Sequence, residues 1–174
     1  MIDDPVLLSR VIIRPATHGD LPALEWDGEF IHFRRLYEDV YLQAIKGSSL
    51  MWVAELQEEG IIGQAFVSLA SYRSELSDGI SRAYVYGFRV KPVYRSRGVG
   101  ASIMSMVETD LIERGYKSVT LNVGRDNYLA RRLYERLGYR VVAPEPGRWS
   151  YIDHLGQRQE VIEPAWRMEK NLTG

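Results

Sequence analysis

The sequence predicts an α/β fold in which one mixed, mostly antiparallel central sheet carries helices on its faces. The chain has 174 residues, of which 45% are hydrophobic and 26% charged, and this composition suits one apolar core. Segments with the alternation of strands and segments with the periodicity of helices follow one another along the chain. No repeat, low-complexity tract or linker interrupts them, so we expect one domain over residues 1–174.

The first part of the chain predicts a strand followed by two helices. A short β-type run at 11–13 ends at a proline, and capping side chains then precede a helix over 21–26. Apolar side chains at helical spacing predict a second helix between Phe30 and Ala44. Gly47 follows it, where a left-handed residue would end the helix.

Three strands are expected next. The alternating segments 50–56 and 61–70 flank a Glu-Glu-Gly turn, which predicts an antiparallel hairpin. Residues 82–90 also have strand character. The period of two would place three aromatic side chains of this strand on one face: Tyr84, Tyr86 and Phe88.

The second half predicts two strand-to-helix units. An apolar stripe beginning at Val99 predicts a helix that ends at Gly115. A strand over 118–123 leads into another helix, which either Asp126 or Asn127 caps. The remainder is expected to contain strands at 139–142, 149–153 and 165–170, with a turn around Gly156.

Composition excludes several classes of function. Twenty-two basic residues face 23 acidic ones, so no excess of positive charge would attract nucleic acid or an anionic membrane. The absence of cysteine excludes disulfides and thiolate chemistry, and three scattered histidines form no metal-ligand motif. The N-terminal sequence has no basic region ahead of a long apolar run, and no later run of about 18 apolar residues exists. We therefore expect a cytoplasmic protein without a metal. Its oligomeric state, monomer or homodimer, stays open.

The segment VKPVYRSRGVGAS carries the strongest chemical pattern. Gly98 and Gly100 let the backbone approach a ligand closely, and the helix that follows directs free N–H groups toward it. A pyrophosphate fits this description, and Arg95 and Arg97 add cationic donors at the rim. A dinucleotide fingerprint would need glycine in place of Ile103, and a Walker loop would need a Gly-Lys-Ser/Thr end. The alternative is a plain tight turn before a helix.

Two motifs together resemble the GNAT superfamily of N-acetyltransferases. RSRGVG resembles the first acyl-CoA motif of that family, and NVGRDNYLARRLYERLGY resembles the second at the expected distance. The opening RPATHGDLPAL is similar to the family's first strand and helix, and the two motifs span about residues 82–142. The resemblance implies a GNAT-type fold with splayed central strands and acetyl-CoA as the acetyl donor.

The resemblance also implies roles for individual residues. The splayed strand end, Phe88 to Val90 with Arg89 between them, would hydrogen-bond the acetyl and pantetheine groups through its backbone. Asn127 would hold the pantetheine arm, and Tyr134 would lie beside the thioester sulfur. Seven residues along a helix return to the same face within about 20°, so these two side chains can contact one ligand. An N-cap and a core tyrosine are the structural alternative. The pyrophosphate would be wrapped by Ser96, Arg97, Gly98, Val99, Gly100 and Ala101.

The implied activity is transfer of an acetyl group to a primary amine by direct attack, with Tyr134 stabilising or protonating the leaving thiolate. A noncatalytic acyl-CoA-binding or sensing module is the alternative. Asn122 and Tyr84 stand where relatives carry a catalytic glutamate, so the general base is open. Tyr84 and Tyr86 are candidates for a water relay, or else for sheet packing.

The acceptor would be a small-molecule or peptide amine, with no nucleic acid or membrane as partner. Glu25 and Glu29 are candidates for attracting an ammonium ion, although a solvated charged loop is the alternative. Tyr37 is a candidate for an aromatic wall. A weakly basic amine would be the easier substrate, because its deprotonation costs less at neutral pH. These residues do not distinguish an amino acid, an aminated drug, a polyamine or a peptide N-terminus.

Overall fold

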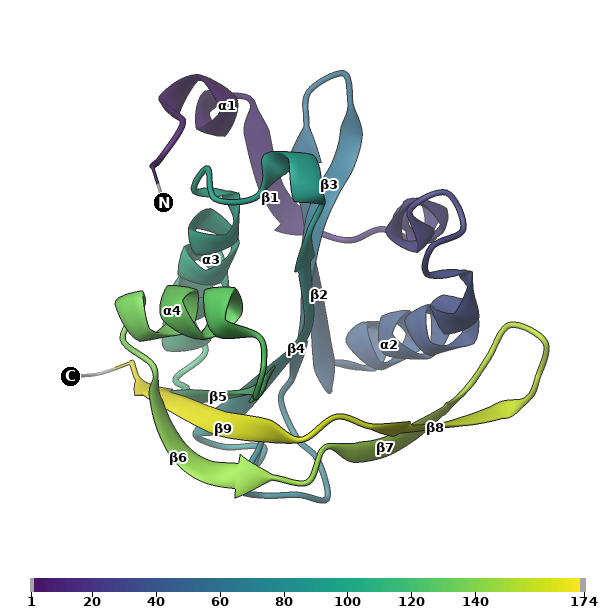
Figure 1. The fold of residues 1–174 in the computed structure, drawn as a ribbon, viewed down its shortest axis with the longest axis vertical. Coiled ribbons are helices and arrows are strands. Elements are labelled where there is room, and N and C mark those ends of the chain that lie inside the picture. The colour runs from purple at the N-terminus through teal and green to yellow at the C-terminus, as the bar shows by residue number, and fades with distance from the viewer. Residues whose placement is uncertain (1, 173–174) are drawn as a thin grey trace.

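A seven-stranded sheet forms the centre of the computed structural model, which describes residues 2–172. Its spatial order is β1-β2-β3-β4-β5-β9-β6, and β7 and β8 form a separate two-stranded ribbon (Figure 1). The mixed, mostly antiparallel sheet agrees with the predicted fold class. The strands are β1 (Val11–Pro15), β2 (Ser49–Leu56), β3 (Gly60–Ser68), β4 (Arg82–Val90), β5 (Ser118–Gly124), β6 (Arg140–Glu145), β7 (Arg148–Ile152), β8 (Arg158–Ile162) and β9 (Ala165–Asn171).

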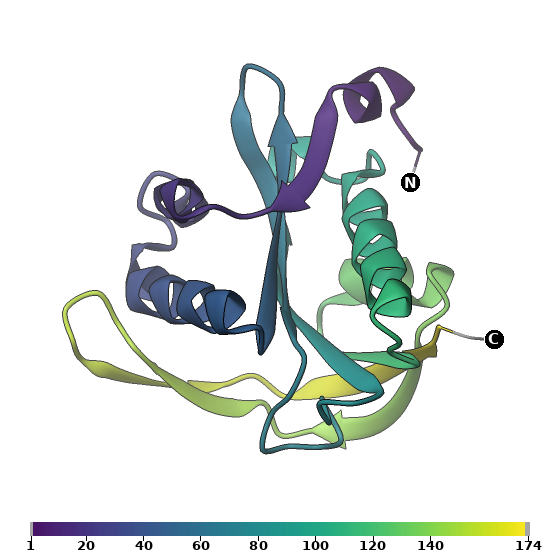
Figure 2. The same ribbon diagram turned by 180° about the vertical axis from the view of Figure 1, so that it is seen from behind.

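Helices cover both faces of the sheet (Figures 1 and 2). α3 (Val99–Glu113) and α4 (Tyr128–Arg136) lie on one face, above the larger apolar core, and the short α1 (Pro5–Ser9) adds Leu7 to this core. α2 (Arg34–Lys46) lies on the opposite face over a second core that contains Tyr37 and Phe66. None of the helices in residues 2–172 is both long and apolar enough to span a membrane.

The sheet opens between β4 and β5, which form the one parallel pair among the described strands. Their pairing begins at Arg82 with Ser118 and stops at Val85 with Leu121. Both strands continue beyond this point without bonding each other, β4 to Val90 and β5 to Gly124. The resulting opening is the splay of central strands that the resemblance implied.

A β-bulge in β4 shifts the alternation of its side chains between the two faces of the sheet by one residue. Gln64 of β3 pairs with Arg89 and Phe66 pairs with Tyr86, so β4 carries one extra residue between these pairs. Gly87 has a φ of +61°, and a Cβ atom there would lie 2.5 Å from the Phe66 ring, so glycine is required at this point.

The bulge corrects one expectation. Tyr84 and Tyr86 do share a face, and their rings stack 5.5 Å apart. Tyr86 belongs to the core under α2, whereas Phe88 belongs to the core under α3 and α4. The prediction that Phe88 shares the face of the two tyrosines was therefore wrong, because the extra residue breaks the period of two.

The N-terminal region also differs from the expected helices. The segment predicted as helix over 21–26 is a 3₁₀ helix, His18–Glu25, with Pro22 inside it. Positive φ angles at Trp26, Asp27 and Gly28 then turn the chain, so that α2 begins at Arg34 instead of Phe30. α1 and β8 were not predicted. Gly47 ends α2 with a φ of +89°, as expected from its position.

Gly147 gives the first testable prediction. It joins β6 to β7 with a φ of +69°, and a Cβ atom there would overlap the carbonyl group of Glu163. Gly147→Ala should lower the free energy of unfolding by about 3 kcal/mol, because backbone must move to admit the methyl group. Gly60→Ala is the matched control: its φ is +91°, but nothing lies within 4 Å of the added atom. It should cost about 1 kcal/mol in chemical denaturation. Equal costs for the two variants would contradict the close approach at Glu163.

Candidate active site

The glycine loop leaves β4 and turns into α3 at Gly98. Gly98 caps this helix in the left-handed conformation, with a φ of +96°, and no side chain of the described residues caps the first turn. The N–H groups that open α3 are therefore available to an anion. A Cβ atom on Gly100 would lie 3.1 Å from the tip of the Phe88 ring, so the helix approaches the strand end closely here.

The two arginines of the loop already have partners within the protein. Arg95 donates from Nε to the carbonyl oxygen of Val90 at 2.7 Å, which ties the loop to the end of β4. Arg97 forms an ion pair with Asp4 at 2.7 Å, and the Asp4 N–H donates to the Arg97 carbonyl oxygen. The Arg97 guanidinium lowers the pKa of the Asp4 carboxyl. The N-terminal segment therefore braces the loop, a contact that sequence reasoning missed.

Tyr134 belongs to α4, on its buried face, with only 7% of its surface exposed. Its ring is 6.1 Å from that of Phe88 and 6.0 Å from that of Tyr139. No described residue hydrogen-bonds its hydroxyl group. Burial raises the pKa of Tyr134 well above its usual range, so the hydroxyl stays protonated and can donate.

Asn127 caps α4, two turns before Tyr134. Its side-chain amide oxygen accepts from the Ala130 N–H at 3.3 Å. Its backbone N–H donates to the Gly124 carbonyl oxygen. The capping interaction thus uses the side-chain oxygen and leaves the amide NH₂ available. Both structural alternatives, the N-cap and the buried tyrosine, are observed, and each leaves a polar group that a ligand can use.

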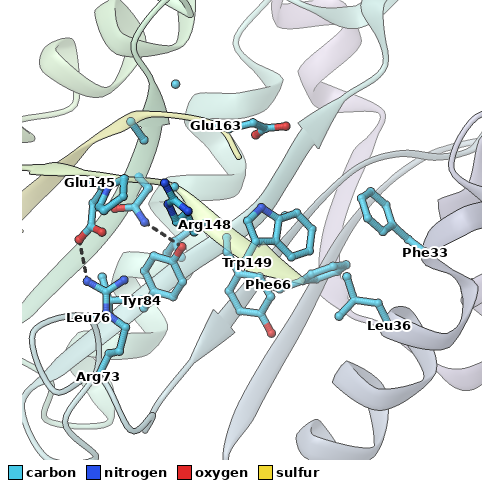
Figure 3. A pocket seen from close by; sticks show the side chains of 18 of the residues that line it. Phe33, Leu36, Phe66, Arg73, Leu76, Tyr84, Glu145, Arg148, Trp149 and Glu163 are labelled. Atoms are coloured by element: carbon cyan, nitrogen blue, oxygen red, sulfur yellow. Dashed lines mark hydrogen bonds and ion pairs between the residues drawn. The ribbon is translucent and has the colours of Figure 1, made fainter. Parts of the chain in front are cut away.

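A cavity of about 590 Å³ lies on the other side of the opening, beside α2 (Figure 3). We call it the α2-side cavity. Gly87 of β4 and Gly124 of β5 line it, so it reaches the place where the two strands separate. Its aromatic lining is Phe33, Tyr37, Phe66, Tyr72, Tyr84, Tyr86 and Trp149, and its charged lining is Arg73, Arg89, Glu145, Arg148 and Glu163.

Tyr84 and Tyr86 form part of the cavity wall. The Asn122 amide nitrogen lies 3.3 Å from the Tyr84 hydroxyl oxygen, and the Asn122 amide oxygen is buried with no described partner. Burial raises the pKa of Tyr84, and it raises the pKa of Tyr86 to about 12. Neither tyrosine is an anionic base at neutral pH. Their hydroxyl groups can still form hydrogen bonds to water and so take part in a proton relay.

Glu145 is a buried carboxylate in the cavity wall that sequence reasoning missed. Only 3% of its surface is exposed, and its Oε1 accepts from Arg73 at 2.8 Å and from Arg167 at 3.0 Å. In Figure 3 the Arg73–Glu145 pair lies beside Tyr84. Glu145 stands between two prolines in the sequence, a setting without a chemical signature, and only the fold brings it to Tyr84.

The two acidic candidates for the acceptor site are Glu25 and Glu29. Glu25 accepts two hydrogen bonds from Arg34, both at 2.9 Å, and Glu29 is exposed. Neither is among the residues that line the α2-side cavity. Tyr37 does line it, and Arg89 donates to the Tyr37 hydroxyl at 3.2 Å.

The protein thus has a mixed sheet that opens between β4 and β5, with an uncapped helix start on one side of the opening and an aromatic cavity on the other. Comparison with families agrees, since the acetyltransferase (GNAT) family model matches residues 19–139. The chain belongs to this family.

Solved structures of similar fold cover nearly the whole chain. Ard1 from Thermoplasma volcanium has a TM-score of 0.72 at 19% identity, covering 95% of this chain and 99% of its own. NAA60 from Arabidopsis thaliana, in complex with acetyl-CoA, has a TM-score of 0.71 at 21% identity, covering 94% and 99%. Spermidine/spermine N-acetyltransferase SpeG from Vibrio cholerae has a TM-score of 0.70 at 16% identity, covering 96% and 95%. At these identities the likeness is one of fold.

Proposed function

We propose that the protein transfers an acetyl group from acetyl-CoA to a primary amine by direct attack. The observation that carries this proposal is the opening between β4 and β5. The glycine loop, Phe88 and Tyr134 lie on one side of it, and the α2-side cavity reaches it from the other. A donor and an acceptor bound on these two sides would meet where the strands separate.

The cofactor-binding side fits acetyl-CoA in its chemistry. The N–H groups that open α3 lack a side-chain cap and are suited to a pyrophosphate. The amide NH₂ of Asn127 and the backbone of β4 from Phe88 to Val90 would hold the pantetheine arm. Bound there, acetyl-CoA supplies a thioester whose carbonyl carbon an amine can attack.

The chain's own residues then act on developing charge. A backbone N–H of the free β4 end would hydrogen-bond the carbonyl oxygen as it gains negative charge. The Tyr134 hydroxyl would donate to the departing sulfur. Because burial raises the pKa of Tyr134, hydrogen bonding contributes more than complete proton transfer does.

The acceptor must lose a proton before it attacks. An α-amine of pKa ~8 costs about 1.4 kcal/mol to deprotonate at pH 7, against about 5 kcal/mol for an amine of pKa ~10.4. Asn122 and Tyr84 stand where relatives carry glutamate, and Glu145 is engaged by two arginines. We therefore propose that the amine enters largely neutral. The two stacked tyrosines would relay to water the proton that the nitrogen loses after it attacks the carbonyl carbon.

The pH dependence of activity tests this assignment. With no enzyme-borne base, kcat/KM should rise with pH through the pKa of the amine itself, so two acceptors about two pH units apart in pKa should give inflections about two units apart. The raised pKa values of Tyr84 and Tyr86 predict no second inflection from these groups below about pH 10. An inflection that stays constant across acceptors and vanishes in Glu145→Gln would identify that carboxylate as the base.

A noncatalytic acyl-CoA-binding or sensing module remains the second candidate. The protonated Tyr134 hydroxyl, which has no partner within the described part of the chain, favours the enzyme, because binding alone does not need a donor at that place. A thiol-release screen with acetyl-CoA and a panel of amines separates the two: release of thiol that depends on an amine supports the transferase, and tight binding without release supports the module.

A cytoplasmic location stays a prediction, and the oligomeric state stays open.

A further inference from the structure

Arg89 is a cation in the wall of the α2-side cavity and has no acidic partner among residues 2–172. Its guanidinium lies 4.2 Å from the centre of the Phe30 ring and 5.3 Å from that of Phe33. One N–H donates to the Tyr37 hydroxyl at 3.2 Å. No carboxylate of the described residues lies within ion-pairing distance of it. An arginine has five N–H donors, so most of this fork is available to a ligand.

The other charges of the cavity do not cancel this one. Glu145 is already bonded to Arg73 and to Arg167, which leaves no negative charge there in excess. Arg148 and Glu163 also line the cavity, and neither has an ion-pair partner among residues 2–172. The unpaired charged groups of the cavity are therefore two arginines, Arg89 and Arg148, and one glutamate, Glu163. Together they carry one net positive charge.

A positive cavity selects among amines in two ways. It disfavours the protonated amine, which helps the acceptor enter in its reactive neutral form. It also disfavours any second ammonium group, as in a polyamine, and attracts a negative group carried by the same molecule. Arginine presents a planar fork that matches a carboxylate, and the stacking on Phe30 and Phe33 holds that fork in place.

We infer that the acceptor is a small amine that carries a carboxylate, namely a free α-amino acid with an apolar or aromatic side chain, and that Arg89 binds its carboxylate. This inference rests on the proposed function. The aromatic lining suits an apolar side chain, and about 590 Å³ lies within the usual size of a small-ligand site. A peptide N-terminus fits less well, because it has no carboxylate next to the reacting amine.

Matched pairs of amino acid and amino acid amide test the inference. Thiol release would be measured with phenylalanine, leucine and methionine, each beside its amide. The amine of the amide is less basic than that of the acid, so more of it is neutral and reactive at a given pH. A preference for the acid would therefore have to come from binding. We expect kcat/KM, divided by the fraction of each acceptor whose amine is neutral at the assay pH, to be about 10- to 100-fold higher for the acid, the range of a charge-assisted hydrogen bond. Equal or higher values for the amides on this basis, with the wild-type protein, would overturn the inference.

Arg89→Gln should remove this preference. We expect kcat/KM for the acid to fall about 10- to 100-fold, while that for the amide changes little. Calorimetry with acetyl-CoA should give an unchanged Kd, since the cofactor would use the backbone of β4 and not this side chain. Arg148→Gln is the matched control, because it removes the other unpaired arginine of the same cavity. Retention of the preference in Arg89→Gln, or its loss only in Arg148→Gln, would show that Arg89 is not the carboxylate site.

Direct binding separates this inference from the proposed function. Phenylalanine titrated into the protein without acetyl-CoA should bind more tightly than phenylalaninamide, and the difference should disappear in Arg89→Gln. If this pattern holds but no amine is acetylated, the carboxylate site stands and the proposed transferase fails. If polyamines or peptide N-termini are acetylated and amino acids neither bind nor react, the transferase stands and the carboxylate site is wrong.

Discussion

Tyr134→Phe should lower kcat about 100-fold, on an acceptor for which chemistry limits the rate, while acetyl-CoA binding stays unchanged. The substitution removes only a hydroxyl group, and the ring keeps its packing between Phe88 and Tyr139. No described residue bonds that hydroxyl, so its loss leaves no protein donor or acceptor unpaired and should cost little stability. A difference in kcat therefore reports on the leaving sulfur.

Tyr116→Phe is the control for this experiment. Tyr116 is also a buried tyrosine of the core under α3, and its hydroxyl donates to the Leu69 carbonyl oxygen at 3.4 Å. Removing that hydroxyl should change kcat by less than about threefold, since it bonds no ligand-facing group. Stopped-flow or pre-steady-state measurement of the chemical step would compare both variants with the wild type. A wild-type rate in Tyr134→Phe would assign Tyr134 a purely structural role.

Gly100→Val should weaken acetyl-CoA binding more than about 100-fold, and Gly100→Ala about 10-fold. The added Cβ atom would lie 3.1 Å from the Phe88 ring and 3.5 Å from Leu133, in the space between the strand end and α4. A larger side chain would either fill this space or push Phe88 out of place. Both outcomes disturb the surface that the pantetheine arm would occupy.

The control for Gly100 lies on the same helix. Ser105→Val places the same β-branched residue on the exposed side of α3, where it costs only a few tenths of a kcal/mol of helix propensity. Isothermal titration of acetyl-CoA into each variant gives the affinities, and circular dichroism verifies folding. An unchanged Kd in a folded Gly100→Val protein would remove the glycine loop from the cofactor site.

The sequence correctly predicted those helices, turns and caps that depend on residues close together in the chain. The hairpin of β2 and β3, the left-handed Gly47 and the cap at Asn127 each depend on a few neighbouring residues, and each is observed. The 3₁₀ geometry of His18–Glu25 depends on Pro22, which lacks the N–H that a regular helical turn would use. Here the pattern of apolar residues indicated a helix, but its type was decided by one side chain.

Long-range contacts determined the parts of the site that the sequence did not predict. The bulge at Gly87 depends on the Phe66 ring of the neighbouring strand, and Glu145 reaches Arg73 across the fold. The Arg97–Asp4 pair joins residues 93 positions apart. The motifs indicated where a cofactor would bind, whereas the unpaired charge of Arg89 can be recognised only when every possible carboxylate partner has been located.

The bulge in β4 has a consequence for how substrate choice can change. Consecutive residues of one strand serve different chambers, since Phe88 packs beneath α4 while Arg89 lines the α2-side cavity. Under the proposed function, exchange of cavity side chains such as Leu36 or Trp149 would therefore alter which amine is accepted, and the donor side would not have to be rebuilt. Designed changes of acceptor should leave Gly87 and Phe88 untouched and begin at α2 or at the β7–β8 ribbon.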